Sequence, residues 1–290
     1  MTSSIELIPS FKIGNPFREG GQEHDRHLLL EIGGRSVTLA VYNGEKQLLT
    51  GLEHYQLPES FEEIYRQLED FLLTHEWIRK QYRAVWICFN TSDALLFPEE
   101  LHDPSIQELV LNTVSGDLPD GDVINELVEK CGFYCVYRVP SSLYDLIGSR
   151  FGEESATHIY SVMARFNAVN PVQDEMEVVI GAGRMTVQLT LDGKLQLMQS
   201  YPCGNGVEAA YFLLNIRQQF GLDAEAIPVV LSGMVEMDSA LEQEISKYFR
   251  ETRFAEKPSG VDHTEEFSQY PAHYFHTISK LALCVSSAVA

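Results

Sequence analysis

Two glycine-containing turns carry the residue types in this sequence that are best suited to bind phosphate. Gly33 and Gly34 follow one apolar run, and Gly181, Ala182 and Gly183 follow another. Successive backbone N–H groups in such a turn can form a concave surface that binds an anion. Glycine also permits the positive φ angles of a sharp turn, so the same residues have a purely structural interpretation. The sequence favours the structural interpretation and leaves the other open.

A dinucleotide-binding fingerprint is one alternative for the second turn. Gly181 and Gly183 match its first two glycines, but Thr186 stands where the third belongs. The residues that follow alternate like a strand, so we expect no helix N-terminus to face a pyrophosphate. We therefore reject this interpretation.

Metal binding and nucleophilic catalysis have weaker support. Cys131, Cys135, His273 and His276 are residue types that bind zinc. Residues four apart on an extended strand, however, lie about 13 Å apart, which is too far to share one metal ion. Ser232 precedes a glycine but lacks the G-x-S-x-G pattern of a nucleophile elbow. Buried thiols and a core or turn serine are the interpretations that we favour.

Polar side chains follow the apolar run AVWICF. Asn90, Thr91, Ser92 and Asp93 come directly after it. Ligands of α/β sheets bind at the carboxyl ends of strands, although local turn capping is the favoured explanation here. The loop at 199–206 is the corresponding segment of the second half.

The first turn belongs to a module of strands and one helix. A strand, the turn and a second strand cover residues 28–44, which end in an Asn-Gly hairpin signal. A third strand is expected over 45–57, and Ser60 with Glu63 forms a capping box for the helix that follows. A continuous apolar strand at 84–89 completes the module.

The second turn belongs to a module with the same order of elements. A strand at 177–180 leads into the turn, and two further strands follow it. Asn205 with Glu208 starts the helix, 145 residues after Ser60, and 227–233 is the buried strand. The same elements in the same order indicate a repeat of architecture.

The remaining segments connect and extend the two modules. We expect a strand at 133–139 and helices at 122–131, at 141–151, at 155–169, after Asp238 as N-cap, and from 272 onward. We divide the chain into an N-terminal tail at 1–26, a first subdomain at 27–153 and a second subdomain at 154–290.

This pattern resembles the actin-like ATPase superfamily, which includes actin, Hsp70 chaperones and sugar kinases. The resemblance implies an α/β fold of mixed sheets, the actin-like (ribonuclease H-like) fold, with two related halves around a cleft. The stretch from DGKLQLMQSYPCGNG to KYFRETRF (192–254) and HYFHTISKLALC (273–284) resemble, more narrowly, an uncharacterised bacterial family of actin-like proteins of unknown function. A more distant likeness is to the actin-like scaffold protein of type IV pilus assembly.

In catalytic members of the superfamily each turn has the pattern Asp-x-Gly, and the aspartates hold Mg²⁺. Here Glu31 and Val179 occupy those positions. A carboxylate at Glu31 can still bind a cation, whereas Val179 cannot. The Gly-Gly pair that packs on adenine is reduced to Ser232-Gly233-Met234. The resemblance thus implies a degenerate nucleotide cleft, without a catalytic residue, formed by Glu31, Gly33, Gly34, Gly181, Ala182, Gly183 and Gly233.

Composition restricts the partners and the compartment. Lys plus Arg number 21 and Asp plus Glu number 42, so the net charge is −21, which repels nucleic acid and anionic lipid. No apolar run approaches the roughly 20 residues of a membrane span, and the first residues lack the pattern of a signal peptide. The 5 cysteines favour a reducing compartment. We expect a soluble cytoplasmic protein with no nucleic-acid partner.

Three functions remain open from the sequence. The leading hypothesis is a non-catalytic actin-like scaffold that binds a protein partner, with no cofactor and with a homodimer as one possible state. The second is a divergent ATP-binding protein or ATPase that combines Glu31 with another carboxylate, such as Asp93 or Asp174, and uses ATP and Mg²⁺. The third is a small-ligand sensor that uses the cleft between the halves.

Overall fold

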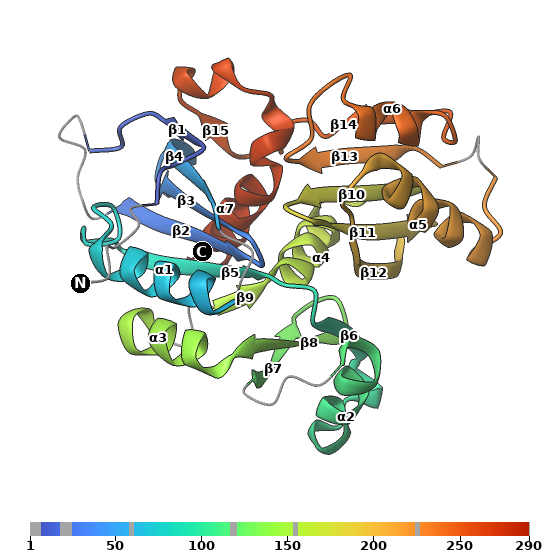
Figure 1. Cartoon of the computed structure of the whole chain (residues 1–290), viewed down its shortest axis with the longest axis horizontal. Coiled ribbons are helices and arrows are strands. Elements are labelled where there is room, and N and C mark those ends of the chain that lie inside the picture. The colour runs from blue at the N-terminus through green and yellow to red at the C-terminus, as the bar shows by residue number, and fades with distance from the viewer. Residues whose placement is uncertain are drawn as a thin grey trace.

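The computed structural model describes residues 7–17, 25–57, 61–116, 121–152, 156–223 and 227–289. Two large sheets lie on either side of a pair of helices, and a third, smaller sheet lies beneath them in Figure 1. No described helix is both long and apolar enough to cross a membrane.

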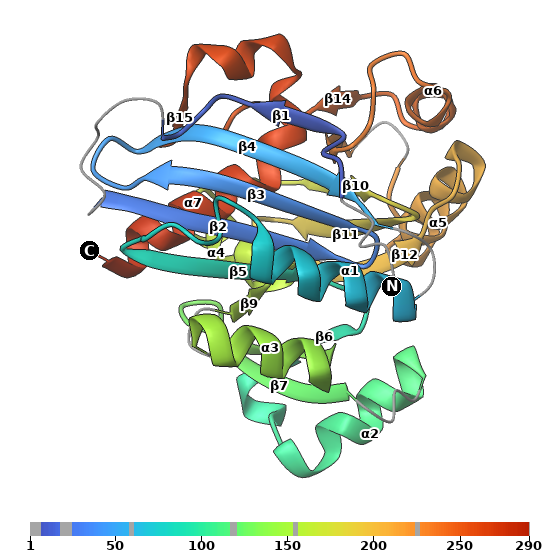
Figure 2. The same ribbon diagram turned by 60° about the vertical axis from the view of Figure 1, so that its left-hand side comes forward.

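The first sheet contains the predicted strands of the first module. Its strands are β1 (Phe11–Ile13), β2 (Arg26–Gly33), β3 (Ser36–Asn43), β4 (Leu48–Gln56), β5 (Ala84–Asn90), β9 (Ala156–His158) and β15 (Asp262–His263). β3 pairs antiparallel with β2 and β4, whereas β5 pairs parallel with β2. The helix α1 (Phe61–Thr74) connects β4 to β5 and lies alongside this sheet in Figure 2. Its residues Leu68, Phe71 and Leu72 belong to the core of the sheet.

The short strands of the first sheet come from distant parts of the chain. β1 lies in the segment expected to be an N-terminal tail, and it pairs with β4 at Leu52–His54. β15 also pairs with β4, and β9 pairs with β5. The division into 27–153 and 154–290 stays a prediction. β9 and β15 both follow residue 154 in the chain and join the first sheet.

The second sheet repeats the core of the first. Its strands are β10 (Glu175–Gly181), β11 (Arg184–Leu191), β12 (Lys194–Pro202), β13 (Val229–Gly233) and β14 (Thr252–Phe254). The order β12-β11-β10-β13 matches β4-β3-β2-β5, with the same two antiparallel pairings and one parallel pairing. The fold class predicted from the sequence is therefore confirmed.

The helix of the second module begins where the sequence predicts. Asn205 caps α5 (Gly206–Gln219), and its side chain accepts a hydrogen bond from the backbone N–H of Glu208 at 3.0 Å. The corresponding capping box, Ser60 and Glu63, lies outside the described side chains.

A third sheet corrects one prediction. It consists of β6 (Ala94–Pro98), β7 (Gly121–Val128) and β8 (Phe133–Pro140), with the 3-10 turn η2 (Glu99–Leu101) and the helices α2 (Pro104–Ser115) and α3 (Ser141–Phe151). The helix expected at 122–131 is wrong, because residues 121–128 form β7 and pair antiparallel with β8 along their whole length. Cross-strand pairing here overrides the local helical spacing of apolar residues.

Two helices separate the large sheets, as Figure 1 shows. They are α4 (Ile159–Val169) and α7 (His276–Val289), which also contact each other. The helix expected at 155–169 thus starts later, after β9, and the final helix follows the 3-10 turns η4 (Glu265–Gln269) and η5 (Ala272–Phe275). The prediction of Asp238 as an N-cap is also wrong: α6 (Ala240–Ser246) is capped by Ser239, and Asp238 has a φ of 61°.

A buried ion pair joins α7 to the second sheet. The Nζ atom of Lys280 lies 2.6 and 2.7 Å from the two carboxylate oxygens of Glu177 on β10. His276 Nε2 lies 3.4 Å from the same carboxylate. Burial raises the pKa of Glu177, but Lys280 and His276 outweigh this effect and hold it at about 2. This ion pair therefore fixes α7 to the second sheet.

Candidate functional site

The two glycine turns meet in one cleft. It encloses a cavity of about 140 Å³ that is lined from both hairpins, from the end of β13 and from α7. The residues at this cavity include Glu31, Gly34, Arg35, Val179, Gly181, Ala182, Arg184 and Gly233. Gly33 and Gly183 belong to the same two turns but do not line it. The structure thus brings most of the predicted site residues together.

Each turn is followed by an arginine that lies against the opposite turn. A Cβ atom added to Gly34 would lie 4.0 Å from Nη1 of Arg184. A Cβ atom added to Gly183 would lie 3.7 Å from Nη1 of Arg35. Arg35 is exposed, whereas Arg184 is largely covered. The two guanidinium groups therefore occupy the space between the turns.

Glycine is required at some positions of the turns and not at others. Gly183 has a φ of 76°, a conformation that favours glycine, but Gly33, Gly34 and Gly181 are not in this region. Gly233 has a φ of 83°, and an added Cβ would lie 2.2 Å from the carbonyl oxygen of Ile180. Glycine is thus required at Gly233 because the end of β13 approaches β10 closely.

Glu31 is bound within the protein. Its Oε1 atom accepts a hydrogen bond from Nδ2 of Asn90 at 2.7 Å. The Oδ1 atom of Asn90 in turn accepts one from Nη2 of Arg184. Burial raises the pKa of Glu31, and Asn90 and Arg184 oppose this effect. These three side chains form a continuous link from the first hairpin through β5 to the second hairpin.

Val179 provides no carboxylate at the position in the second half that corresponds to Glu31. It is 6% exposed and packs in the core cluster of the first sheet. In register it lies opposite Ser232 and Thr186, as Glu31 lies opposite Cys88 and Thr38. The two positions are therefore equivalent, and only the one in the first half offers an oxygen to a cation.

The floor of the cleft carries a neutral histidine that sequence reasoning missed. Nδ1 of His54 lies 2.9 Å from Oγ1 of Thr38, and both side chains line the cavity. Burial lowers the pKa of His54 to about 4, so its imidazole is uncharged at neutral pH. Both residues occupy inward-facing positions in the ordinary alternation of their strands. The sequence therefore contains no signal that distinguishes them from core residues.

The size of the cleft limits what it can hold. Pockets for small molecules usually have volumes of about 300–1,000 Å³, well above the 140 Å³ present here. The arginines give the cleft positive charge beside a single carboxylate, Glu31. In this arrangement the cleft suits a small anion.

The other carboxylates considered for catalysis lie elsewhere. Asp93 faces Arg138, whose Nη2 is 3.4 Å from Oδ2. Oδ1 of Asp174 accepts a hydrogen bond from the backbone N–H of Asp192 at 2.7 Å, at the end of β10 opposite the glycine turn. Neither residue lines the cavity beside Glu31.

The remaining candidate residues have separate structural partners. Of the polar loop, only Asn90 joins the cleft, and Thr91 lies 3.4 Å from Nε2 of His158. The Sγ atom of Cys131 donates to the carbonyl of Ala164. His273 and His276 each contact a backbone carbonyl, and Ser232 is fully buried. Within the described residues no group of three or more His, Cys, Asp or Glu side chains is arranged to hold a metal ion.

Residues 19–252 match a protein family described as "Protein of unknown function (DUF3822)". No curated protein matches the sequence.

Several solved structures share the fold. A Bacteroides thetaiotaomicron protein, described as having an actin-like ATPase fold and unknown function, is 14% identical with a TM-score of 0.75, over 91% of this chain and 97% of its own. A chain of a PilM–PilN type IV pilus biogenesis complex is 13% identical with a TM-score of 0.52, over 89% and 98%. The ethanolamine utilization protein EutJ from Carboxydothermus hydrogenoformans is 11% identical with a TM-score of 0.51, over 93% and 92%. The likeness shows an actin-like ATPase fold.

Proposed function

This chain belongs to the DUF3822 family of proteins of unknown function, and we propose that it is a non-catalytic protein of actin-like fold that binds a protein partner. The proposal rests on the link between Glu31, Asn90 and Arg184. These side chains bind one another in the place where the superfamily holds phosphate and Mg²⁺. The amide of Asn90 thus takes one oxygen of the only described carboxylate that this site would offer to a cation.

The substitution at Val179 supports the same proposal. Charge stabilisation at preorganised groups is commonly the largest contribution to catalysis, and the loss of one such group costs about 3–4 kcal/mol. Val179 offers no charge or hydrogen bond, and its side chain belongs to the apolar core cluster of the first sheet. The fold is thus retained, whereas fewer of the groups that would act on a phosphate are present.

We place the partner at the outer edge of the second sheet. β12 is nine residues long, and no described strand pairs with the side that faces away from β11. An unpaired edge offers backbone N–H and C=O groups to an extended segment of another protein. The PilM neighbour, which its description places in a complex with PilN, supports a protein-binding role by analogy.

Turnover and binding of nucleotide test the non-catalytic part of the proposal. We expect no phosphate release from Mg²⁺-ATP, and no change in melting temperature with ATP or ADP. A nucleotide at 100 times its Kd would add about 2.7 kcal/mol of stability, which a thermal shift detects easily. Steady phosphate release that Glu31→Ala abolishes would establish the divergent ATPase instead.

Site-specific cross-linking tests the position of the partner. We would place a photoreactive amino acid at Gln196, which is exposed on β12, and as a control at Gln243, which is exposed on α6. In the native cell we expect a cross-linked polypeptide from position 196 and none from 243. Equal cross-linking at both positions would contradict the edge as the binding surface. A cross-link to a second copy of this chain would indicate a homodimer.

A further inference from the structure

The helix α2 lies at the periphery of the molecule, on the third sheet, as Figure 1 and Figure 2 show. It contacts β6 and β8, and its residues Gln107 and Leu111 are fully buried. Nη1 of Arg138 on β8 donates a hydrogen bond to Oδ1 of Asn112 at 2.5 Å, near the end of the helix. At the start of the helix, Asp103 accepts a hydrogen bond from a backbone N–H of the first turn. The helix is thus anchored near both ends and along one face.

The other face of α2 is apolar. Ile106, Leu109 and Val114 lie on this face at helical spacing, and Leu101 precedes it in η2. These four side chains are between 44% and 67% exposed, and they are four of the twelve large hydrophobic side chains that are exposed in the described part of the chain. A single exposed hydrophobic residue is ordinary, but a cluster of them marks an interaction site. A helix that faces only water carries polar residues on that side, so this face is suited to contact with another chain.

Acidic side chains accompany the apolar face. Glu99, Glu100, Asp103 and Glu108 are all exposed, and none of them forms an ion pair with a described Lys or Arg. The segment 84–129, which includes them, contains ten Asp or Glu residues and no Lys or Arg. Arg138 contacts α2 but is buried beneath it. The surface around the apolar face is therefore negative and attracts a cationic partner.

We infer that α2 is the docking surface for an amphipathic helix of another protein, whose basic residues flank its apolar face. Apolar side chains three and four residues apart on two helices interdigitate, as ridges that pack into grooves. The distance from Ile106 to Val114 is about 12 Å at 1.5 Å per residue, so a partner helix of about three turns covers both and reaches Leu101. A second copy of this chain fits poorly, because the same unpaired carboxylates would face each other. This surface is separate from the edge of β12, and the inference is independent of the proposed function.

Three synthetic peptides test the two parts of this recognition. The first is a helix of about five turns, roughly 18 residues, with leucine on one face and lysine on the other. The second has the same residues in an order that breaks the apolar face, and in the third glutamate replaces lysine. We would measure binding to the full chain by fluorescence anisotropy at about 0.15 M salt, where the Debye length is about 8 Å and attraction to the distant net charge is screened. We expect the first peptide to bind at least about tenfold more tightly than the second, and the third not to bind.

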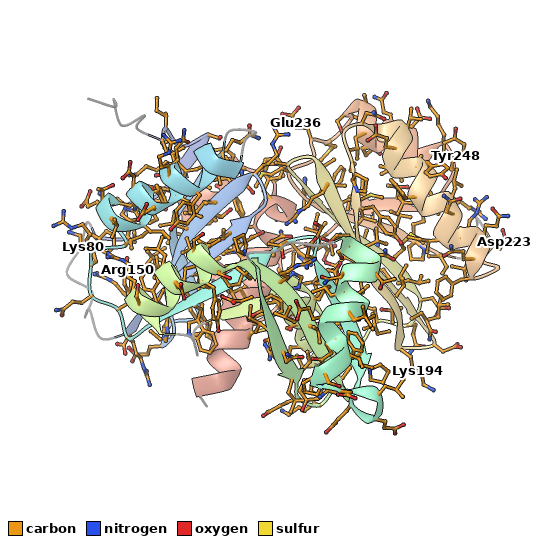
Figure 3. The ribbon with its side chains drawn as sticks, turned by 60° about the horizontal axis from the view of Figure 1, so that its bottom comes forward. Lys80, Arg150, Lys194, Asp223, Glu236 and Tyr248 are labelled. Carbon is orange, nitrogen blue, oxygen red and sulfur yellow. The ribbon has the colours of Figure 1, made fainter. Side chains whose placement is uncertain are left out.

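Variants assign the binding to α2. Ile106→Gln with Leu109→Gln removes two apolar side chains and retains residues that are compatible with a helix. Both positions are exposed, so we expect a melting temperature close to that of the parent and binding of the first peptide that is weaker by at least about tenfold. Tyr248→Gln is the matched control, because Tyr248 is also an exposed hydrophobic residue but lies far from the green ribbon of α2 in Figure 3. We expect this control to bind like the parent.

A second pair of substitutions tests the charge. Glu100→Gln with Glu108→Gln removes two exposed carboxylates beside the apolar face. We expect this variant to bind the first peptide several-fold more weakly, and its affinity to depend less on salt concentration than that of the parent.

Three outcomes would overturn the inference. Equal affinities for the first and second peptides would show that the negative charge alone attracts them. Equal binding by the parent and by the variant at positions 106 and 109 would place the peptide elsewhere on the molecule. A dimer of the parent in sedimentation velocity that this variant dissociates would assign the face to a second copy. The cross-link from position 196 reports on a different surface, so its failure and the failure of this test are distinguishable.

Discussion

Arg184 donates a hydrogen bond to the side-chain oxygen of Asn90, although the two residues are 94 positions apart and belong to different halves of the molecule. Asn90 donates its amide to Glu31 in turn. A phosphate-binding turn of the superfamily presents free backbone N–H groups to a ligand. Here the side chain that follows the turn spans the cleft, so the protein itself occupies the position between the two turns.

The first prediction concerns the stability that this contact provides. Arg184→Ala removes a charge-assisted hydrogen bond and leaves Glu31 with one fewer favourable neighbour. We expect it to lower the free energy of unfolding by about 1.5–3 kcal/mol, measured by urea denaturation. Arg35→Ala is the matched control, because Arg35 follows the equivalent turn but is exposed. It is expected to cost about 0.5 kcal/mol or less. Equal losses of unfolding free energy in the two variants would show that the contact with Asn90 does not stabilise the protein.

The second prediction concerns the pair of Lys280 and Glu177. Either Lys280→Met or Glu177→Gln leaves a buried charge without its partner and is expected to cost about 3–5 kcal/mol. The double variant removes both charges, and we expect it to be about as stable as the parent. Additive losses in the double variant would contradict this expectation.

The same pair gives a pH dependence with a defined sign. The pKa of Glu177 is held at about 2, below its ordinary value of 4.5. The stability that the pair contributes is therefore present above about pH 4.5 and is lost as the pH falls from 4.5 towards 2. Unfolding free energies of the parent should decline over this range more steeply than those of the double variant.

The general architecture could be predicted because its signals are local. The hairpins end in Asn-Gly and Asp-Gly pairs, and Asn205 precedes its helix directly. The prediction of a helix at 122–131 was wrong because the spacing of Val123 and Leu127 fits a helix as well as it fits a strand. These residues form a strand because the segment pairs with Phe133–Pro140.

The site could be predicted only in part. The equivalence of Glu31 and Val179 follows from the repeated turns and from the resemblance to the superfamily. The contact between Arg184 and Asn90 depends on how the two halves pack, and the spacing of residues within either half carries no information about that packing.

The third prediction concerns the helix start at Asn205. Asn205→Ala removes the acceptor for the N–H of Glu208 and is expected to cost about 1 kcal/mol. Asn215→Ala, in the interior of the same helix, should instead be neutral or stabilise by up to about 0.5 kcal/mol, because alanine favours the helix. Thermal unfolding of both variants separates capping from propensity, and equal effects would argue against the cap.

The fourth prediction concerns the missing carboxylate. Val179→Asp places a second carboxylate at a position that is 6% exposed and belongs to the core cluster, and it is expected to lower stability by about 1–3 kcal/mol. It should not produce phosphate release from Mg²⁺-ATP, because Arg184 still spans the cleft. Release by Val179→Asp alone would mean that this one residue is all that separates the protein from an ATPase.

The buried pair of Glu177 and Lys280 also constrains the order in which the protein can be made. The two residues are 103 positions apart in the chain, and ribosomes add roughly 5–20 residues per second. Glu177 is therefore synthesised roughly 5–20 seconds before its partner exists. During that interval the carboxylate of Glu177 on β10 cannot pair with Lys280 of α7. The contact between β10 and α7 can therefore form only after the 103 residues that separate the two partners have been made.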